Sequence, residues 1–225
     1  MGTVSLDALS HLFWLGRYLE RVKITLALSD TIYDSLLDFD TDLDVHGLCE
    51  KLAIPDVYDS PDDFITTYLF DEEDPNSVIS NLGRAFDNAV VIRDSIQSVT
   101  LSYVQLAHNI MKAGAKSQSP MLEVQETLDA IYSFWGALDD FAPTSQVRYV
   151  VKTGGTLERL DLALRLGRDV VPAKDLVGRL VNRLYHSKLD FDEAALKRIV
   201  EHAERDDCEE SAAEMIRDLE GLIAL

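Results

Sequence analysis

Two Glu-Arg dipeptides are the residues of this chain whose types and spacing could do chemistry. The first lies in Gly16-Arg17-Tyr18-Leu19-Glu20-Arg21 and the second in Gly155-Thr156-Leu157-Glu158-Arg159. An arginine guanidinium binds a carboxylate or a phosphate through two parallel hydrogen bonds, and a positioned glutamate can act as a general acid or base. The two copies therefore indicate an anion-binding site, with Glu20 and Glu158 as candidate catalytic residues.

The charges within each copy leave two interpretations open. Arg17 and Arg21 stand four residues apart and Glu20 follows Arg17 by three, so the three side chains are neighbours on one side of a helix. One glutamate compensates only one arginine well, and the second copy adds Arg159 and Asp161. Either the two copies form salt bridges that tie two helices together, or they line a charged pocket that binds an anionic ligand.

A further polar set lies among apolar neighbours in the middle of the chain. Asp87 and Asn88 are poor helix formers, and Arg93 and Asp94 follow them closely. They either form hydrogen bonds between helices or join the two Glu-Arg pairs around one cavity. Asp87, Asn88 and Arg93 are therefore further candidates for binding an anion or a partner.

The composition excludes several classes of function. Forty acidic against 21 basic residues give a net charge of −19, which repels nucleic acid and anionic membrane surfaces. No apolar run approaches the roughly 20 residues that span a bilayer. The histidines and the two cysteines lack the spacing of a metal site or a disulfide framework, and phosphate-loop and nucleophile motifs are absent. We expect a cytoplasmic protein without a metal or cofactor.

Apolar residues at helical spacing predict the elements that position these side chains. Ser-Pro and Asp-Pro pairs at Ser60-Pro61, Asp74-Pro75 and Ser119-Pro120 are typical helix starts. An acidic stretch from 38 to 44 should end the first helix, and Gly154-Gly155 should interrupt or kink the fourth. The chain is predicted to be one all-α domain, residues 1–225, a bundle of long helices with an internal pseudo-repeat and shorter C-terminal helices. The expected helices span residues 4–38, 75–113, 120–141 and 144–169, with shorter ones near 173–188, 191–206 and 209–223.

The repeat predicts where the two Glu-Arg pairs lie. Duplicated helices tend to pack as pseudo-symmetric neighbours, so Glu20, Arg21, Glu158 and Arg159 should meet in the interior of the bundle although they lie far apart in sequence. A buried Glu-Arg contact between the two helices would follow.

Three blocks of the sequence together resemble the bacterial Alpha-E family, a predicted α-helical domain named for its Glu-Arg motif. They follow the family's order across about residues 5 to 168. The resemblance implies an all-α fold and a companion role beside atypical ATP-grasp proteins and transglutaminase-like peptidases in making or processing amide-linked peptides. The blocks are Leu12–Arg21, then Asp74–Val78 with Asp87-Asn88-Ala89 and Ile92-Arg93-Asp94, then Leu157–Asp161.

The chain departs from the family pattern at two places. Lys23 stands where an acidic residue is usual, and Gly155-Thr156 replaces an Arg-aromatic pair in the second copy. With that arginine missing, we expect the first copy to face a ligand. Arg17, Arg21 and Arg93 should form a positive spot for an anionic metabolite or an acidic peptide, while Arg159 ties helices together.

Three functions fit these observations. The leading hypothesis is an accessory helical protein that binds a substrate or partner and acts with an ATP-grasp type ligase. The second is an enzyme in which Glu20 or Glu158 acts as a general acid or base while Arg17, Arg21 and Arg159 hold an anionic substrate. The third is a purely structural homodimer of long helices. An enzyme needs its carboxylates to face an open cleft, whereas a scaffold needs them paired with each other.

Overall fold

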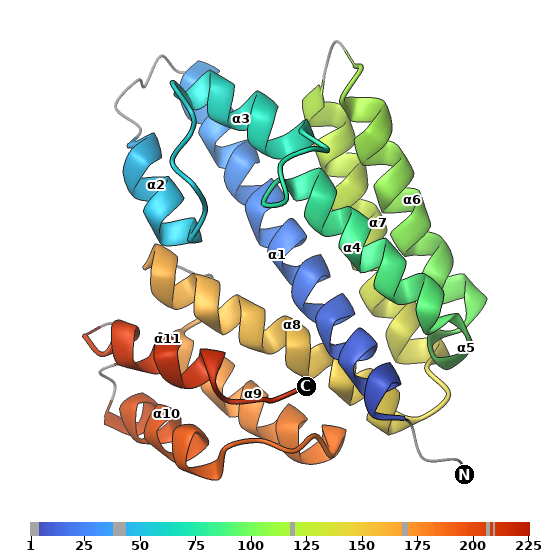
Figure 1. Ribbon diagram of the computed structural model, residues 1–225, viewed down its shortest axis with the longest axis vertical. Helices are drawn as coiled ribbons and strands as arrows, with labels where there is room; N and C mark the ends of the chain where they lie inside the picture. Colours follow the sequence, from blue (N-terminus) through green and yellow to red (C-terminus); the bar gives the residue numbers. More distant parts are fainter. Residues whose placement is uncertain (1–4, 38–43, 118–119, 168–170, 206–207, 209) are drawn as a thin grey trace.

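The chain folds as a bundle of α-helices in the computed structural model (Figure 1), which describes residues 5–37, 44–117, 120–167, 171–205, 208 and 210–225. Within these residues there are eleven helices and no strand, which confirms the all-α class. No helix in the described ranges is long and apolar enough to cross a membrane. The helices are α1 (Leu6–Leu37), α2 (Val45–Leu52), α3 (Pro61–Phe70), α4 (Val78–Val91), α5 (Arg93–Ile96), α6 (Ser98–Gly114), α7 (Pro120–Phe141), α8 (Ser145–Leu166), α9 (Ala173–Ser187), α10 (Glu193–Arg205) and α11 (Ala212–Glu220).

Helix α1 is the central element of the fold (Figure 1). Its apolar residues at three- and four-residue spacing are fully buried, because one face of the helix turns into the core. It packs most extensively against α8 and also against α4, α7 and α3. Helix α8 in turn packs against α9 and α11, and α10 packs against both of these. The fully buried set on α1 is Leu12, Leu15, Leu19, Val22 and Leu26.

Helix starts follow capping chemistry, with one correction. Ser60 caps α3 by accepting from the Asp63 amide, and Pro61 takes the first helical position, as predicted. Helix α4 begins later than Asp74-Pro75, because Ser77 is its N-cap and accepts from the Ser80 amide. The Asp74 carboxylate instead accepts from the Asn76 amide and closes a local turn. The acidic stretch 38–43 and Ser119 lie outside the described residues.

The predicted single helix over 75–113 is wrong, because α4, α5 and α6 replace it. Gln97 adopts a left-handed φ of 71° between α5 and α6, and α4 packs back against α6. The apolar periodicity runs through this reversal because Ile92 and Ile96 are buried at the turn itself. Periodicity reports a buried face and carries no information on where the chain reverses.

The glycines of α8 do not interrupt it, so the predicted interruption near Gly154-Gly155 is wrong. Helix α8 is continuous, and its glycines allow it to pack closely against α1. A Cβ on Gly154 would clash with the Phe13 carbonyl, and a Cβ on Gly16 would clash with the Val151 carbonyl. The two contacts are reciprocal, since each glycine meets the carbonyl three residues before the other. The two helices therefore cross backbone to backbone, as a pseudo-symmetric pair.

Candidate functional site

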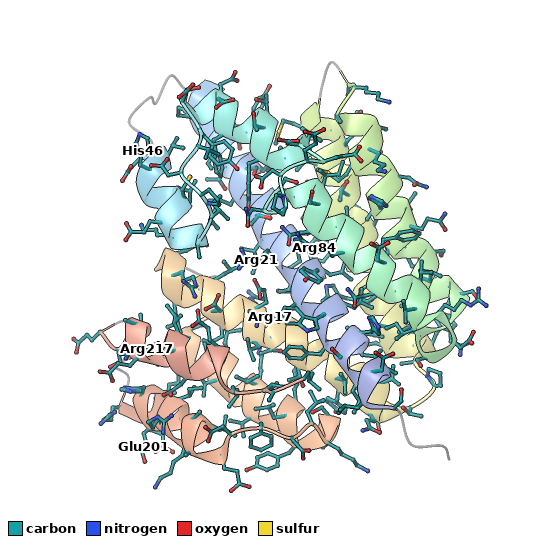
Figure 2. The ribbon with its side chains drawn as sticks, viewed as in Figure 1. Arg17, Arg21, His46, Arg84, Glu201 and Arg217 are labelled. Atoms are coloured by element: carbon teal, nitrogen blue, oxygen red, sulfur yellow. The ribbon has the colours of Figure 1, made fainter. Side chains whose placement is uncertain are left out.

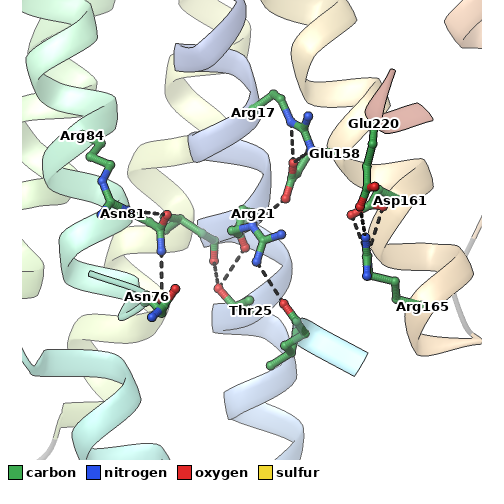
Figure 3. A network of polar contacts seen from close by, with 12 residues as sticks. Arg17, Arg21, Thr25, Asn76, Asn81, Arg84, Glu158, Asp161, Arg165 and Glu220 are labelled. Atoms are coloured by element: carbon green, nitrogen blue, oxygen red, sulfur yellow. Dashed lines mark hydrogen bonds and ion pairs between the residues drawn. The ribbon is translucent and has the colours of Figure 1, made fainter. Parts of the chain in front are cut away.

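One side of the α1–α8 crossing holds a buried ion-pair cluster (Figure 3). Glu158 on α8 is 2% exposed and accepts from two arginines of α1. Arg17 Nη2 lies 2.6 Å from Oε2, and Arg21 Nε lies 2.6 Å from Oε1. Arg21 Nη1 also donates to the Leu52 carbonyl at 3.3 Å. Both guanidinium groups of the first copy are thus bound to the glutamate of the second.

Burial and charge act in opposite directions on Arg21. Desolvation lowers the pKa of its guanidinium, but the adjacent Glu158 carboxylate raises it, and the pKa ends above its ordinary value. Figure 2 shows Arg17 and Arg21 in the middle of the molecule, whereas Glu201 and Arg217 lie at its edge. The cluster therefore joins α1 to α8 from within and matches the interpretation of salt bridges between helices.

The other side of the same crossing holds the remaining Glu and Arg. Consecutive residues of a helix point about 100° apart, so Glu20 and Arg159 face away from the Arg21–Glu158 pair. Both line a cavity of about 200 Å³ between α1, α7, α8 and α9. Glu20 is 5% exposed, and its Oε1 lies 2.5 Å from Lys23 Nζ. The structure therefore brings the two dipeptides together at one crossing, with a salt-bridge side and a cavity side.

The cavity is strongly basic although the protein is strongly acidic. Five cationic side chains line it against two carboxylates, Glu20 and Asp139. Both carboxylates are already paired, with Lys23 and with Lys152, each at 2.5 Å. Of the other cations, Arg179 and Arg183 form no ion pair with a carboxylate of the described residues. The cations are Lys23 from α1, Lys152 and Arg159 from α8, and Arg179 and Arg183 from α9.

Arg183 is a partly buried cation of the cavity that forms no ion pair with a described carboxylate. Burial lowers the pKa of its guanidinium below the ordinary value, and the nearby Arg179 and Arg159 lower it further, against the raising effects of Glu20 and Asp139. Its Nη1 donates to two neutral oxygens, the Thr156 hydroxyl and the Lys152 carbonyl. Among the described residues no carboxylate lies within ion-pair distance of it. A partly buried guanidinium in this state favours a bound anion.

The missing arginine of the second copy explains why the cavity lies on this side. Pseudo-symmetry pairs Arg17 with Gly155, because Gly16 and Gly154 each precede their glutamate by four residues. The space that an arginine would take borders the Trp135 ring, whose Cη2 would lie 2.9 Å from a Cβ on Gly155. The side with Arg17 is closed by ion pairs, and the side with Gly155 stays open.

The structure does not bring the middle polar set to this cavity, so the alternative of one cavity shared with the Glu-Arg pairs is wrong, and Asn88 instead forms a hydrogen bond between helices. Asn88 Oδ1 lies 2.7 Å from His11 Nδ1, and Asn88 Nδ2 donates to the Arg84 carbonyl. Asp87 is exposed at a separate surface hollow. Arg93 is exposed at the start of α5, 3.7 Å from its neighbour Asp94.

Arg93 also lies apart from Arg17 and Arg21, so the three do not form one positive spot. Helix α5, which begins at Arg93, packs against α4 and α6 at the end of their hairpin. Arg17 and Arg21 face Glu158 between α1 and α8 instead.

Asp161 has a structural partner close to the crossing. It is 4% exposed, and Arg165 Nε donates to it at 3.0 Å. The same guanidinium reaches Glu220 of α11 at 2.8 Å (Figure 3). Burial raises the pKa of Asp161, although the hydrogen bond and charge of Arg165 oppose this. Asp161 thus holds Arg165, and Arg165 links α8 to Glu220 on α11.

Sequence reasoning missed four of the five cations in the cavity: Lys23 as a ligand group, Lys152, Arg179 and Arg183. One signal was available for the last two, because Arg179 and Arg183 stand four apart on a helix of an acidic chain. Like charges at this spacing destabilise an isolated helix, so they require a compensating reason. Lys152 precedes the second Glu-Arg by six residues and carried no distinguishing signal.

The comparisons with known proteins agree with the sequence resemblance. No curated protein and no solved structure matches the chain. One family model, described as a predicted alpha-helical domain with a conserved ER motif, matches residues 8–200. That range contains both Glu-Arg dipeptides and every residue that lines the basic cavity. The chain belongs to the Alpha-E family.

Proposed function

We propose that this protein binds an anionic ligand in the basic cavity between α1, α7, α8 and α9. The observation that carries the proposal is the excess of cations there, above all Arg183, in a protein of net charge −19. A local positive potential within a negative molecule draws small anions to one place and repels them elsewhere. The ligand chemistry that matches guanidinium groups is a carboxylate or a phosphate.

The cavity favours binding over a structural role for its arginines. Arg17 and Arg21 both bind Glu158, so each guanidinium on the salt-bridge side of the crossing has a carboxylate within hydrogen-bond distance. On the cavity side, Glu20 is paired with Lys23 and Asp139 with Lys152, which leaves Arg183 on neutral oxygens. A stable fold does not need this arrangement, because burying an uncompensated guanidinium costs free energy.

We further propose that this binding serves an accessory role beside an ATP-grasp type ligase in the cytoplasm. The support is the family resemblance, together with the fit between a carboxylate-binding cavity and a ligase that joins carboxylates to amines. Copurification with the ligase and an ATP-dependent ligation assay with and without this chain test the role. Ligation that does not depend on the chain contradicts it.

Catalysis by Glu20 is the second candidate function. Glu20 is the Glu-Arg carboxylate that lines the cavity, whereas Glu158 is enclosed by two arginines. A general base must reach its substrate, so Glu20 has the better position. If Glu20 is catalytic, Glu20→Gln abolishes turnover of a bound substrate while leaving the affinity nearly unchanged. If the chain only binds, the same variant leaves the ligation assay intact.

The binding proposal has a direct optical test. Trp14 and Trp135 are the only two tryptophans of the chain, and Trp135 lines the cavity. Trp14→Phe therefore makes Trp135 the single reporter. Titration with glutarate or inorganic phosphate at low salt should change its fluorescence saturably, and added salt should weaken the binding. The same titration in Arg183→Gln should lose most of the response, while the exposed control Arg93→Gln should keep it.

A further inference from the structure

The basic cavity adjoins a wider surface trough. The trough has a volume of about 650 Å³ and lies along α8 and α9. It shares Lys152, Arg179 and Arg183 with the cavity, so the two hollows adjoin at these side chains. The trough adds Tyr149, Lys174, Asp175, Gly178 and Asn182 to the lining.

The two hollows differ in how they would hold an anion. Arg183 is partly buried at the boundary, whereas Arg179 and Lys174 are exposed on α9. Gly178 has no atom within 4 Å of the place its Cβ would take, so the trough is open above it. The cavity therefore suits one desolvated anionic group, and the trough suits a longer, solvated part of the same molecule.

The polar groups of the trough distinguish between kinds of extended anion. A polyphosphate carries negative charge on every unit, which would place charge next to the Asp175 carboxylate in the trough. A peptide spaces its acidic side chains apart and has amide groups between them. The Asn182 side chain can donate to and accept from such amides.

We propose that the natural ligand is an acidic peptide segment that lies across both hollows. One side-chain carboxylate enters the cavity at Arg183, and a second binds Arg179 and Lys174 in the trough. This inference rests on the proposed function, because it assigns the ligand class of the same cavity. Two linked sites give a gain in affinity with ligand length that a single site does not.

A series of capped peptides tests this with the Trp14→Phe reporter. Acetylated and amidated peptides of one, two and four glutamates are titrated at low salt, with glutamine peptides of equal length as controls. We expect affinity to rise at least tenfold from one to four glutamates and the glutamine peptides not to bind. In Lys174→Gln, which removes a cation that lines the trough alone, the gain with length should shrink while the one-residue peptide binds as before. Arg183→Gln should weaken the whole series.

The outcomes separate this inference from the proposed function. If all glutamate peptides bind equally, the cavity binds an anion and the trough takes no part, so the inference fails alone. If tripolyphosphate binds more tightly than the four-residue peptide, the inference is also overturned and the ligand is a polyphosphate. If no peptide and no small anion binds, the proposed function fails as well.

Discussion

Arg21 Nε donates to Glu158 Oε1 at 2.6 Å, across 137 residues of sequence, and so links the two Glu-Arg copies directly. The first copy supplies the arginine and the second the glutamate, because the two helices cross where the glycines of the repeat let their backbones touch. The remaining Glu20 and Arg159 then face the opposite side. One repeated dipeptide thus builds both a salt bridge and part of a cavity wall.

Loss of Arg21 should destabilise the fold. Arg21→Ala removes one of the two guanidinium groups bound to a carboxylate that is 2% exposed, while Arg17 stays in place, so we expect the free energy of unfolding to fall by about 1.5–3 kcal/mol. Urea denaturation followed by circular dichroism measures it. The exposed Arg93→Ala is the matched control and should change stability by less than about 0.5 kcal/mol. A loss below 1 kcal/mol in Arg21→Ala would contradict the structural role of the pair.

The helix crossing gives a prediction about glycine. Gly16→Ala and Gly154→Ala place a Cβ against the backbone carbonyls of Val151 and Phe13, which cannot move without separating the helices. Each variant should lose on the order of 3 kcal/mol of stability, comparable with severe overpacking. Gly136→Ala on α7 is the control, because its Cβ meets nothing within 4 Å. It should gain up to about 1 kcal/mol from helix propensity. Equal effects at Gly16 and Gly136 would refute the close crossing.

The pKa values of two histidines should be shifted in opposite directions. The hydrogen bond and charge of Asp56 raise the pKa of His46, and burial together with Lys112 lowers the pKa of His108. His46 therefore contributes stability that is fully present below its unfolded pKa of about 6.5 and is lost as the pH rises through its folded pKa. For His108, the contribution is present above about 6.5 and is lost as the pH falls through its lowered folded pKa.

Proton NMR of the imidazole rings measures both values. Asp56→Asn should lower the pKa of His46 because it removes the partner that lies 2.7 Å from Nδ1. The same substitution should leave the pKa of His108 unchanged. An unchanged His46 titration in this variant would show that another group holds the proton.

Sequence reasoning reached the fold class and the meeting of the Glu-Arg copies, because both depend on local patterns. The apolar spacing of α1 reports its buried face, and the repeat reports the symmetric crossing. The reversal at Gln97 was not predicted, since glutamine is not a typical turn residue and the buried Ile92 and Ile96 continue the helical spacing through it. The basic cavity was not predicted because its cations come from three helices. Only the tertiary fold places Arg179 and Arg183 beside Lys23 and Arg159.

The last prediction concerns which arginines bind and which stabilise. The sequence alone favoured Arg17 as the ligand-facing residue and Arg159 as the tie between helices. The ion pairs of Arg17 with Glu158, and the place of Arg159 in the cavity wall, favour the reverse assignment. We therefore expect Arg17→Ala to lower the melting temperature while ligand affinity stays within about twofold.

Arg183→Gln gives the complementary result. Because burial lowers the pKa of this guanidinium and neutral oxygens alone accept its hydrogen bonds, its removal should leave the melting temperature of the ligand-free protein unchanged or higher. A ligand at 100 times its Kd stabilises the folded state by about 2.7 kcal/mol, and the variant should lose most of that gain. Differential scanning calorimetry of both variants, with and without a four-glutamate peptide, measures the melting temperature and the ligand-induced gain in stability. If Arg17→Ala abolishes the ligand-induced gain and Arg183→Gln keeps it, the ligand binds on the Arg17 side of the crossing and the cavity assignment is wrong.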